Sequence, residues 1–93
     1  MKAILNDHVI AESDDIIECQ GYSYFPRTAV RMEWLTRAPK TDSDRACPHG
    51  VQFYDVAIAD LRAPRAAWSY EAPQPSMKQV ENRISFWQTV NVQ

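Results

Sequence analysis

The segment from Cys47 to Gly50 places a thiol and an imidazole two positions apart, because His49 follows Cys47-Pro48. A thiolate beside an imidazole can act as a nucleophile with its base, and both groups are also metal ligands. A structural zinc ion needs three or four ligands, and only Cys19 and His8 remain to complete such a set. Neither has the spacing of a zinc motif, so we predict no metal site. The structural alternative is a turn in which Cys47 packs as a small hydrophobic residue.

A second candidate is the run from Tyr22 to Arg27, in which Tyr22 and Tyr24 alternate before an arginine. Aromatic rings stack on planar ligands, and a guanidinium offers a fork of donors to a carboxylate or phosphate. These residue types predict one wall of a pocket for a small anionic or aromatic ligand. In the structural alternative, Tyr24 and Phe25 belong to the core and Arg27 forms a surface ion pair.

A third candidate is Trp68, which follows two alanines and precedes Tyr70 by two positions. This pattern is typical of close strand packing around a large ring, and it also fits a further wall of the same pocket. Antiparallel strands can bring such distant segments to one end of a sheet, where an imidazole adds pH dependence between about 5 and 8. The candidate ligand-binding residues are therefore Tyr22, Tyr24, Arg27, Cys47, His49, Trp68 and Tyr70.

Three functional hypotheses remain open at this point. The first is a binding module for a small anionic or aromatic molecule. The second is a small enzyme that uses Cys47 or His49 in acyl or nucleotidyl transfer, although no complete catalytic motif is present. The third is a structural or protein-interaction domain without a pocket. Asp42 and Asp44 resemble paired magnesium ligands, but no glycine-serine phosphate loop precedes them, so we expect a solvated loop there.

Composition narrows the class of protein. With 93 residues and 45% hydrophobic residues, the chain is expected to form a single domain over residues 1–93. The net charge of −2 and the scattered arginines argue against a nucleic-acid partner. The N-terminus has no signal-peptide core, and no stretch approaches the ~20 apolar residues of a membrane helix. We therefore expect a cytoplasmic monomer or weak homodimer with two free thiols, no cofactor and no membrane partner.

Hydrophobic residues recur with a period of two along most of the chain, which indicates β-strands. The alternation is clearest over residues 30–37, and apolar residues on both faces of residues 51–59 predict a central strand. Asn6-Asp7-His8 and Gly21 predict turns. The expected strands and extended segments are residues 1–5, 9–11, 16–19, 30–37, 51–59, 66–70, 84–87 and 89–92.

Residues 38–50 are polar and predict the longest loop. One short helix is expected near the C-terminus, because Ser76 and Gln79 have the spacing of a capping box. The predicted fold class is mainly β: a compact antiparallel sheet of at least five strands, or a partly open barrel, with that one helix.

Several short motifs in order resemble a bacterial family called domain of unknown function 427. They are the opening Met1–Ala3 and Val9–Asp15, Tyr24-Phe25-Pro26, Cys47-Pro48, Tyr54-Asp55-Val56, Ala66-Ala67-Trp68 with Tyr70, and Phe86-Trp87. The resemblance covers essentially the whole chain. It implies a compact β-rich cytoplasmic domain without an established reaction, and a nucleotidyltransferase-style label is attached to this family.

The chain departs from the family pattern after Cys47-Pro48. Family members commonly carry an aromatic residue and a lysine before the glycine, whereas here His49 directly precedes Gly50. A site to which that lysine contributes is altered in this chain. The missing glycine-serine loop likewise gives no support to nucleotidyl transfer.

Overall fold

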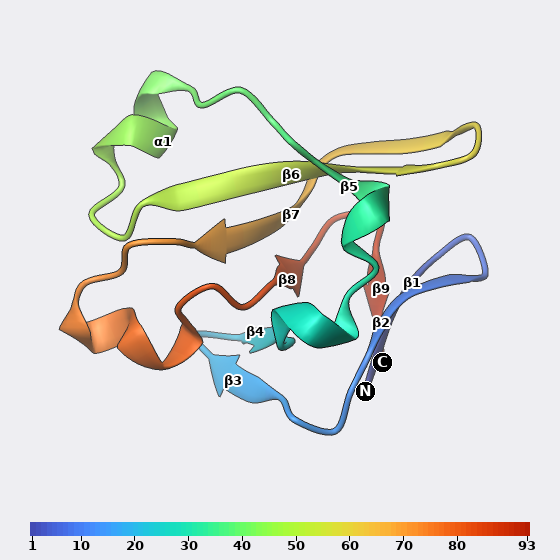
Figure 1. The fold of residues 1–93 in the computed structure, drawn as a ribbon, viewed down its shortest axis with the longest axis horizontal. Helices are drawn as coiled ribbons and strands as arrows, with labels where there is room; N and C mark the ends of the chain where they lie inside the picture. Colours follow the sequence, from blue (N-terminus) through green and yellow to red (C-terminus); the bar gives the residue numbers. More distant parts are fainter.

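Nine β-strands form three antiparallel sheets in the computed structural model, which describes residues 1–93 (Figure 1). The strands are β1 (Lys2–Leu5), β2 (His8–Glu12), β3 (Ile17–Cys19), β4 (Tyr22–Tyr24), β5 (Leu35–Arg37), β6 (Val51–Ile58), β7 (Leu61–Tyr70), β8 (Ser85–Phe86) and β9 (Asn91–Val92). The helical segments are the α-helix α1 (Asp42–Ala46) and the 3-10 helices η1 (Arg27–Ala29), η2 (Met32–Trp34) and η3 (Pro75–Val80).

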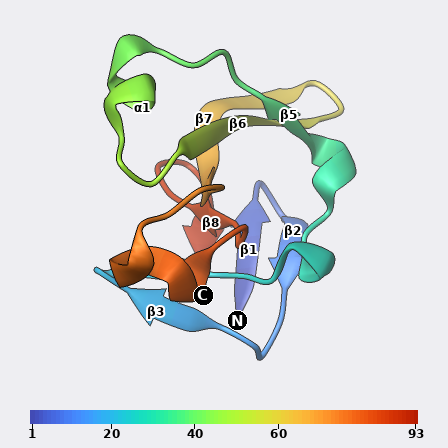
Figure 2. The same cartoon turned by 60° about the vertical axis from the view of Figure 1, so that its left-hand side comes forward.

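The three sheets have the strand orders β2-β1-β9, β3-β4 and β5-β6-β7-β8, and the fold is not a closed barrel. The predicted mainly β, antiparallel class is confirmed. The expected single sheet of at least five strands is wrong, because the largest sheet has four strands. In two views, α1 and the β3–β4 hairpin lie on opposite sides of the molecule with β6, β7 and β8 between them (Figures 1 and 2). None of the helices is long and apolar enough to cross a membrane.

Two of the three hairpins with two-residue turns have left-handed backbone at both turn positions. Asn6 and Asp7 have φ angles of 45° and 69°, and Gln20 and Gly21 have φ angles of 52° and 85°. Two consecutive positive φ angles give a turn whose twist matches that of the paired strands. The sequence-based turn predictions at Asn6-Asp7-His8 and Gly21 are confirmed.

Strand β6 is covered on both faces, as its sequence predicts. It lies between β5 and β7, and its residues Tyr54, Val56 and Ile58 join a core cluster of 16 buried residues that also includes side chains of β1 and β2. Its first residue, Val51, joins a smaller cluster of five buried residues on the other face, together with Trp68. The β6–β7 pair therefore separates two apolar interiors.

The extended strand expected over residues 30–37 is wrong. Within this segment only residues 35–37 form a strand, β5, and the 3-10 helix η2 precedes it. Val30 forms an isolated bridge with Ala11 of β2, whereas Leu35 pairs with Val56 of β6. The chain therefore passes from one sheet to another within a few residues, and this requires a turn that side-chain alternation alone does not reveal.

The helix expected near Ser76 is also wrong in type and in its cap. Residues 75–80 form the 3-10 helix η3, which begins with Pro75 and has no side-chain cap. Its buried residues are Met77 and Val80. Side chains three positions apart are aligned in a 3-10 helix, so this spacing suits the tighter helix.

The only α-helix, α1, lies within the segment expected to be a solvated loop. Thr41 and Asp44 form a reciprocal capping box at its start, with hydrogen bonds of 3.0 and 3.2 Å. Asp44 is only 4% exposed and makes two hydrogen bonds to the Arg65 guanidinium, at 2.8 and 3.1 Å. The ion pair thus attaches α1 to strand β7.

Arg65 lies where the register of β6 and β7 shifts between Tyr54 and Val56. Its φ angle is 54°, and its N–H donates to the Asp55 carboxylate at 2.9 Å instead of to a ladder carbonyl. A left-handed non-glycine residue costs roughly 1–2 kcal/mol. The contacts of Asp44 and Asp55 with Arg65 offset that cost.

We expect Asp44→Asn to lower the free energy of unfolding by roughly 1–3 kcal/mol, because the variant loses a charged hydrogen-bond acceptor for Arg65. Asp42→Asn on the same helix is the control, since its side chain is fully exposed and the change should stay within about 0.5 kcal/mol. Urea unfolding measures both values. Equal losses in the two variants would contradict this role of Asp44.

The same pair should make stability depend on acid. The hydrogen bonds from Arg65 lower the pKa of Asp44 from 3.8 to about 2. Because the folded-state pKa lies below the unfolded-state value, this stabilisation is complete above about pH 4 and is lost as the pH falls toward 2. Unfolding measured across this window should show a smaller acid loss for Asp44→Asn than for the parent chain.

Candidate functional site

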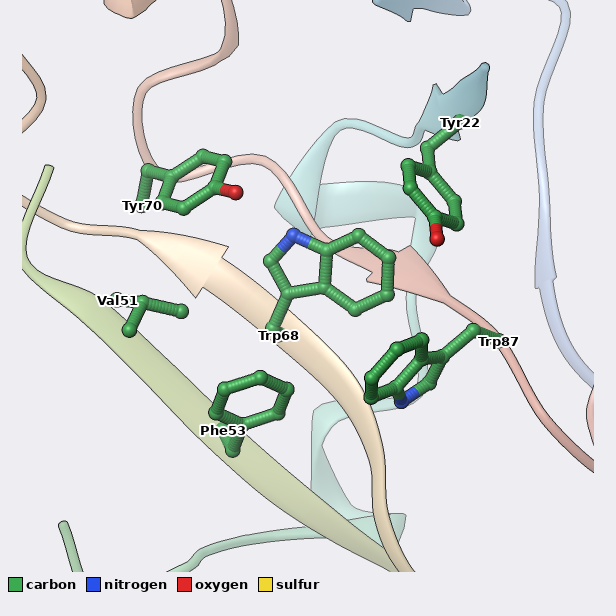
Figure 3. A pocket seen from close by; sticks show the side chains of 6 residues that line it. All are labelled: Tyr22, Val51, Phe53, Trp68, Tyr70 and Trp87. Atoms are coloured by element: carbon green, nitrogen blue, oxygen red, sulfur yellow. The ribbon is translucent and has the colours of Figure 1, made fainter. Parts of the chain in front are cut away.

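A pocket of about 220 Å³ opens on the face of β6–β7 that carries the smaller cluster. Six apolar or aromatic side chains line it, and none of them carries a charge. They are Tyr22, Val51, Phe53, Trp68, Tyr70 and Trp87 (Figure 3).

The strand pair β6–β7 supplies four of these six side chains. Val51 is paired with Tyr70, and Phe53 with Trp68, so these two directly opposed pairs are next to each other on one face of the sheet. Residues two positions apart in a strand share a face, so all four side chains project to the same side of the sheet. The regular antiparallel register therefore builds the floor of the pocket without a loop.

Two further rings come from outside that strand pair. Tyr22 is the first residue of β4, and Trp87 directly follows β8. The indole N–H of Trp87 donates to the backbone carbonyl of Arg65 at 2.7 Å, which fixes its ring against β7. Tyr22 is 38% exposed, so this ring forms the outer rim.

Trp68 lies among the other five lining residues in Figure 3. Its ring stands edge-on to Tyr22 and Trp87, with ring centroids 4.8 and 5.4 Å apart. The Phe53 ring lies 6.3 Å away at a tilted angle. Such aromatic pairs contribute roughly 0.5–1.5 kcal/mol each beyond the area that they bury. The walls of the pocket are therefore held in place by one another.

The indole N–H of Trp68 has no hydrogen-bond partner, although the side chain is only 5% exposed. The Tyr24 hydroxyl lies nearby. The Trp68 N–H is close enough to lower the pKa of Tyr24 against the effect of burial, but the two groups do not meet the geometry of a hydrogen bond. An unpaired buried donor costs roughly 1–3 kcal/mol. Trp68 is the one buried side chain with such an unpaired polar atom, and it lines the pocket.

The buried phenols of Tyr24 and Tyr70 stay neutral at physiological pH. Burial raises the pKa of Tyr24 to about 12, and burial also raises the pKa of Tyr70. Neither ring can therefore supply a negative charge to a bound molecule. The pocket offers π faces, ring edges and neutral hydroxyl groups.

The structure brings six of the seven sequence-predicted site residues to this face. Tyr22, Trp68 and Tyr70 line the pocket, and Tyr24 packs edge-on against Trp68 from within the core, with centroids 6.2 Å apart. The two remaining residues lie beside the lining: Cys47 packs against the same apolar cluster, and the His49 ring lies 5.4 Å from that of Tyr70.

Arg27, the seventh residue, lies on the other face of β7. Its Nη2 donates to the hydroxyl of Ser69 at 3.0 Å, and Ser69 follows Trp68 in the strand. Successive strand residues point to opposite faces, so Arg27 is separated from the pocket by the sheet. Its Nη1 donates to the Tyr54 hydroxyl at 3.3 Å, and its Nε donates to the Asn82 carbonyl at 3.0 Å.

Glu71 completes this polar network behind the sheet. It accepts hydrogen bonds from Arg37 at 3.0 and 3.2 Å and from the Tyr54 hydroxyl at 3.0 Å. Burial alone would raise the pKa of Glu71, but the hydrogen bonds from Arg37 and Tyr54 lower it overall. Arg27 also lies 3.9 Å from the carboxylate. The donors of Arg27 are thus engaged within the protein.

Cys47 and His49 do not form a nucleophile–base pair in this structure. The Nδ1 atom of His49 accepts the backbone N–H of Gln74 at 3.1 Å, and Cys47 makes no side-chain hydrogen bond. A nucleophile activated by a base needs hydrogen-bond contact with it. Both cysteines are free and partly buried, and no three His, Cys, Asp or Glu side chains are grouped to hold a metal ion.

Sequence reasoning missed three lining residues: Val51, Phe53 and Trp87. The first two were identifiable as one face of the predicted central strand, and the residue opposite Phe53 is Trp68. The period of two along residues 51–59 could therefore have placed Val51 and Phe53 on the same face as Trp68. Trp87 fell within the expected extended segment 84–87. It lies two positions after Ser85, the strand partner of Trp68, so the same alternation places it on the pocket face.

Comparison with protein-family models matched residues 1–93 to a family described as a domain of unknown function (DUF427). No curated protein matched the chain.

The hydrogen bonds of Arg27 predict that its side chain stabilises the folded protein. We expect Arg27→Ala to lower the free energy of unfolding by roughly 1–3 kcal/mol, because the fully buried Ser69 hydroxyl loses its donor. Chemical unfolding measures the change, and Arg45→Ala is the control. Arg45 forms only an exposed pair with Asp42, so its removal should change stability by less than about 0.5 kcal/mol. Comparable values for the two variants would show that the network contributes little.

Proposed function

The chain belongs to the family described as a domain of unknown function (DUF427), and we propose that it is a binding module whose aromatic pocket receives one flat ring of a small molecule. The pocket between β6–β7, β4 and the segment after β8 is the binding site. Trp68 forms its centre, and Tyr22 forms its exposed rim.

The observation that carries this proposal is the composition of the pocket wall. Five of the six lining residues are aromatic, and they come from four separate strands or strand ends. Small-molecule sites are concave and mostly apolar, with few polar groups. In an open apolar hollow the lining rings remain exposed to water, and a bound ring removes that apolar surface from water.

The size of the pocket sets the size of the bound group. A dry protein cavity of roughly 150 Å³ holds benzene. The pocket of about 220 Å³ therefore has room for one single or fused ring, and larger parts of a ligand would extend into solvent. The edges and faces of the lining rings match the quadrupole of a planar aromatic guest.

A binding role fits this lining better than group transfer does. None of the six lining residues is a strong nucleophile or a base at neutral pH, and Cys47 and His49 lie outside the lining. The walls can hold and orient a ring, whereas bond cleavage needs a reacting group in contact with the substrate.

The three tryptophans give a direct test with internal controls. We expect indole, added to ¹⁵N-labelled protein, to shift the side-chain N–H signals of Trp68 and Trp87 in nuclear magnetic resonance spectra. The signal of Trp34 should stay in place, because Trp34 packs against His8 and Arg31, away from the pocket. Shifts of Trp34 alone, or no saturable shift, would contradict the proposed site.

Removing the exposed rim should weaken binding without unfolding the protein. We expect Tyr22→Ala to raise the dissociation constant for indole by about 3- to 10-fold, the equivalent of one lost aromatic pair. Tyr22→Phe keeps the ring and should bind as the parent chain does. Thermal unfolding of both variants checks the fold, and equal affinities for the alanine and phenylalanine variants would exclude Tyr22 from the site.

A further inference from the structure

One basic side chain differs from all the others in its surroundings. Of the ten lysine and arginine residues, nine form an ion pair with a carboxylate, and Lys40 does not. Lys40 lies in the connection between β5 and α1 and is exposed. It is therefore the one side-chain cation of this kind whose charge the protein leaves uncompensated.

This ammonium is held beside the aromatic pocket. Lys40 Nζ donates to the backbone carbonyl of Val51 at 3.0 Å, and Val51 lines the pocket. A hydrogen bond to a fixed strand carbonyl restricts a side chain that would otherwise move freely in solvent. An ammonium has three donors, so the contact with Val51 leaves two for another acceptor.

The other charges near the pocket do not favour a cationic guest. The guanidinium of Arg65 lies 4.1 Å from the centre of the Phe53 ring, so it already covers one face of that ring. Its charge is compensated by Asp44 at 2.8 Å. The lining includes no carboxylate, and the phenols of Tyr24 and Tyr70 remain neutral. A bound cation would thus find no carboxylate in the lining, and the one uncompensated charge beside the pocket is the ammonium of Lys40.

We propose that the ligand of this pocket is an aromatic acid, with its ring among the pocket side chains and its carboxylate on the ammonium of Lys40. This proposal rests on the proposed binding function and adds the charge of the ligand to it. Charge complementarity favours an acid, because Lys40 has no carboxylate partner and is hydrogen-bonded to Val51 in the pocket lining. An exposed ammonium is screened by salt, so the preference for the acid should weaken as ionic strength rises.

Three probes with the same ring test the charge preference: indole-3-acetate, indole and tryptamine. They carry a negative, zero and positive charge at pH 8, above the range in which an imidazole normally titrates. Titration followed by the Trp68 and Trp87 signals gives the three dissociation constants. We expect indole-3-acetate to bind at least about 5-fold more tightly than indole, and tryptamine to bind more weakly than indole.

Lys40→Met should bring the ratio between indole and indole-3-acetate to within about twofold, because the apolar stem remains and the charge is lost. Lys2→Met removes the same charge from an exposed pair with Glu12 on another sheet, and it should leave the ratio as in the parent chain. Thermal unfolding confirms that both variants are folded.

The outcomes separate the two proposals. If none of the three probes binds, the binding function itself fails. If indole and tryptamine bind as tightly as indole-3-acetate, or if Lys40→Met keeps the full preference for the acid, the pocket binds rings and the role assigned to Lys40 is wrong.

Discussion

The bulge at Arg65 is the constraint on which the arrangement around the pocket depends. Its N–H is bound by Asp55, its carbonyl accepts the Trp87 indole N–H, and its guanidinium is held by Asp44. One residue in a left-handed conformation thus links β6, α1 and the segment after β8. The same guanidinium lies over the Phe53 ring, so two of the pocket walls, Phe53 and Trp87, contact this single position.

The strand pair β6–β7 gives the protein two chemically different faces. On one face, Trp68 and Tyr70 contribute to an uncharged aromatic hollow. On the other face, Ser69 and Tyr54 accept hydrogen bonds from Arg27, each of whose three nitrogens has a partner within the protein. Alternation along a strand makes this division unavoidable, because neighbouring residues cannot share a face. The polar network therefore stabilises the sheet from one face, and the pocket opens on the other face.

Local signals predicted the strands and turns that depend on a few neighbouring residues. The double-faced pattern of β6, the Asn6-Asp7 turn and the region of Trp68 all emerged from a period of two or from turn chemistry. Tertiary pairing decided the rest. Residues 30–34 alternate between apolar and polar side chains, yet the chain there leaves one sheet for another. Arg27 follows Tyr24 closely in sequence, yet it lies behind β7. Asp44 is buried only because Arg65, distant in sequence, supplies its partner.

Tyr22 is the only lining residue that belongs to the separate two-stranded β3–β4 sheet, and it directly follows the Gln20-Gly21 turn. The floor of the pocket belongs instead to a strand pair embedded between two cores. The pocket thus has a base held inside the fold and a rim carried by a separate short hairpin. Tyr22 is exposed at that rim, so its substitution can widen or narrow the entrance, whereas Tyr24 in the same strand is buried in the core. Under the proposed binding function, the ligand preference can therefore change through Tyr22 while the buried residues of the sheet stay in place.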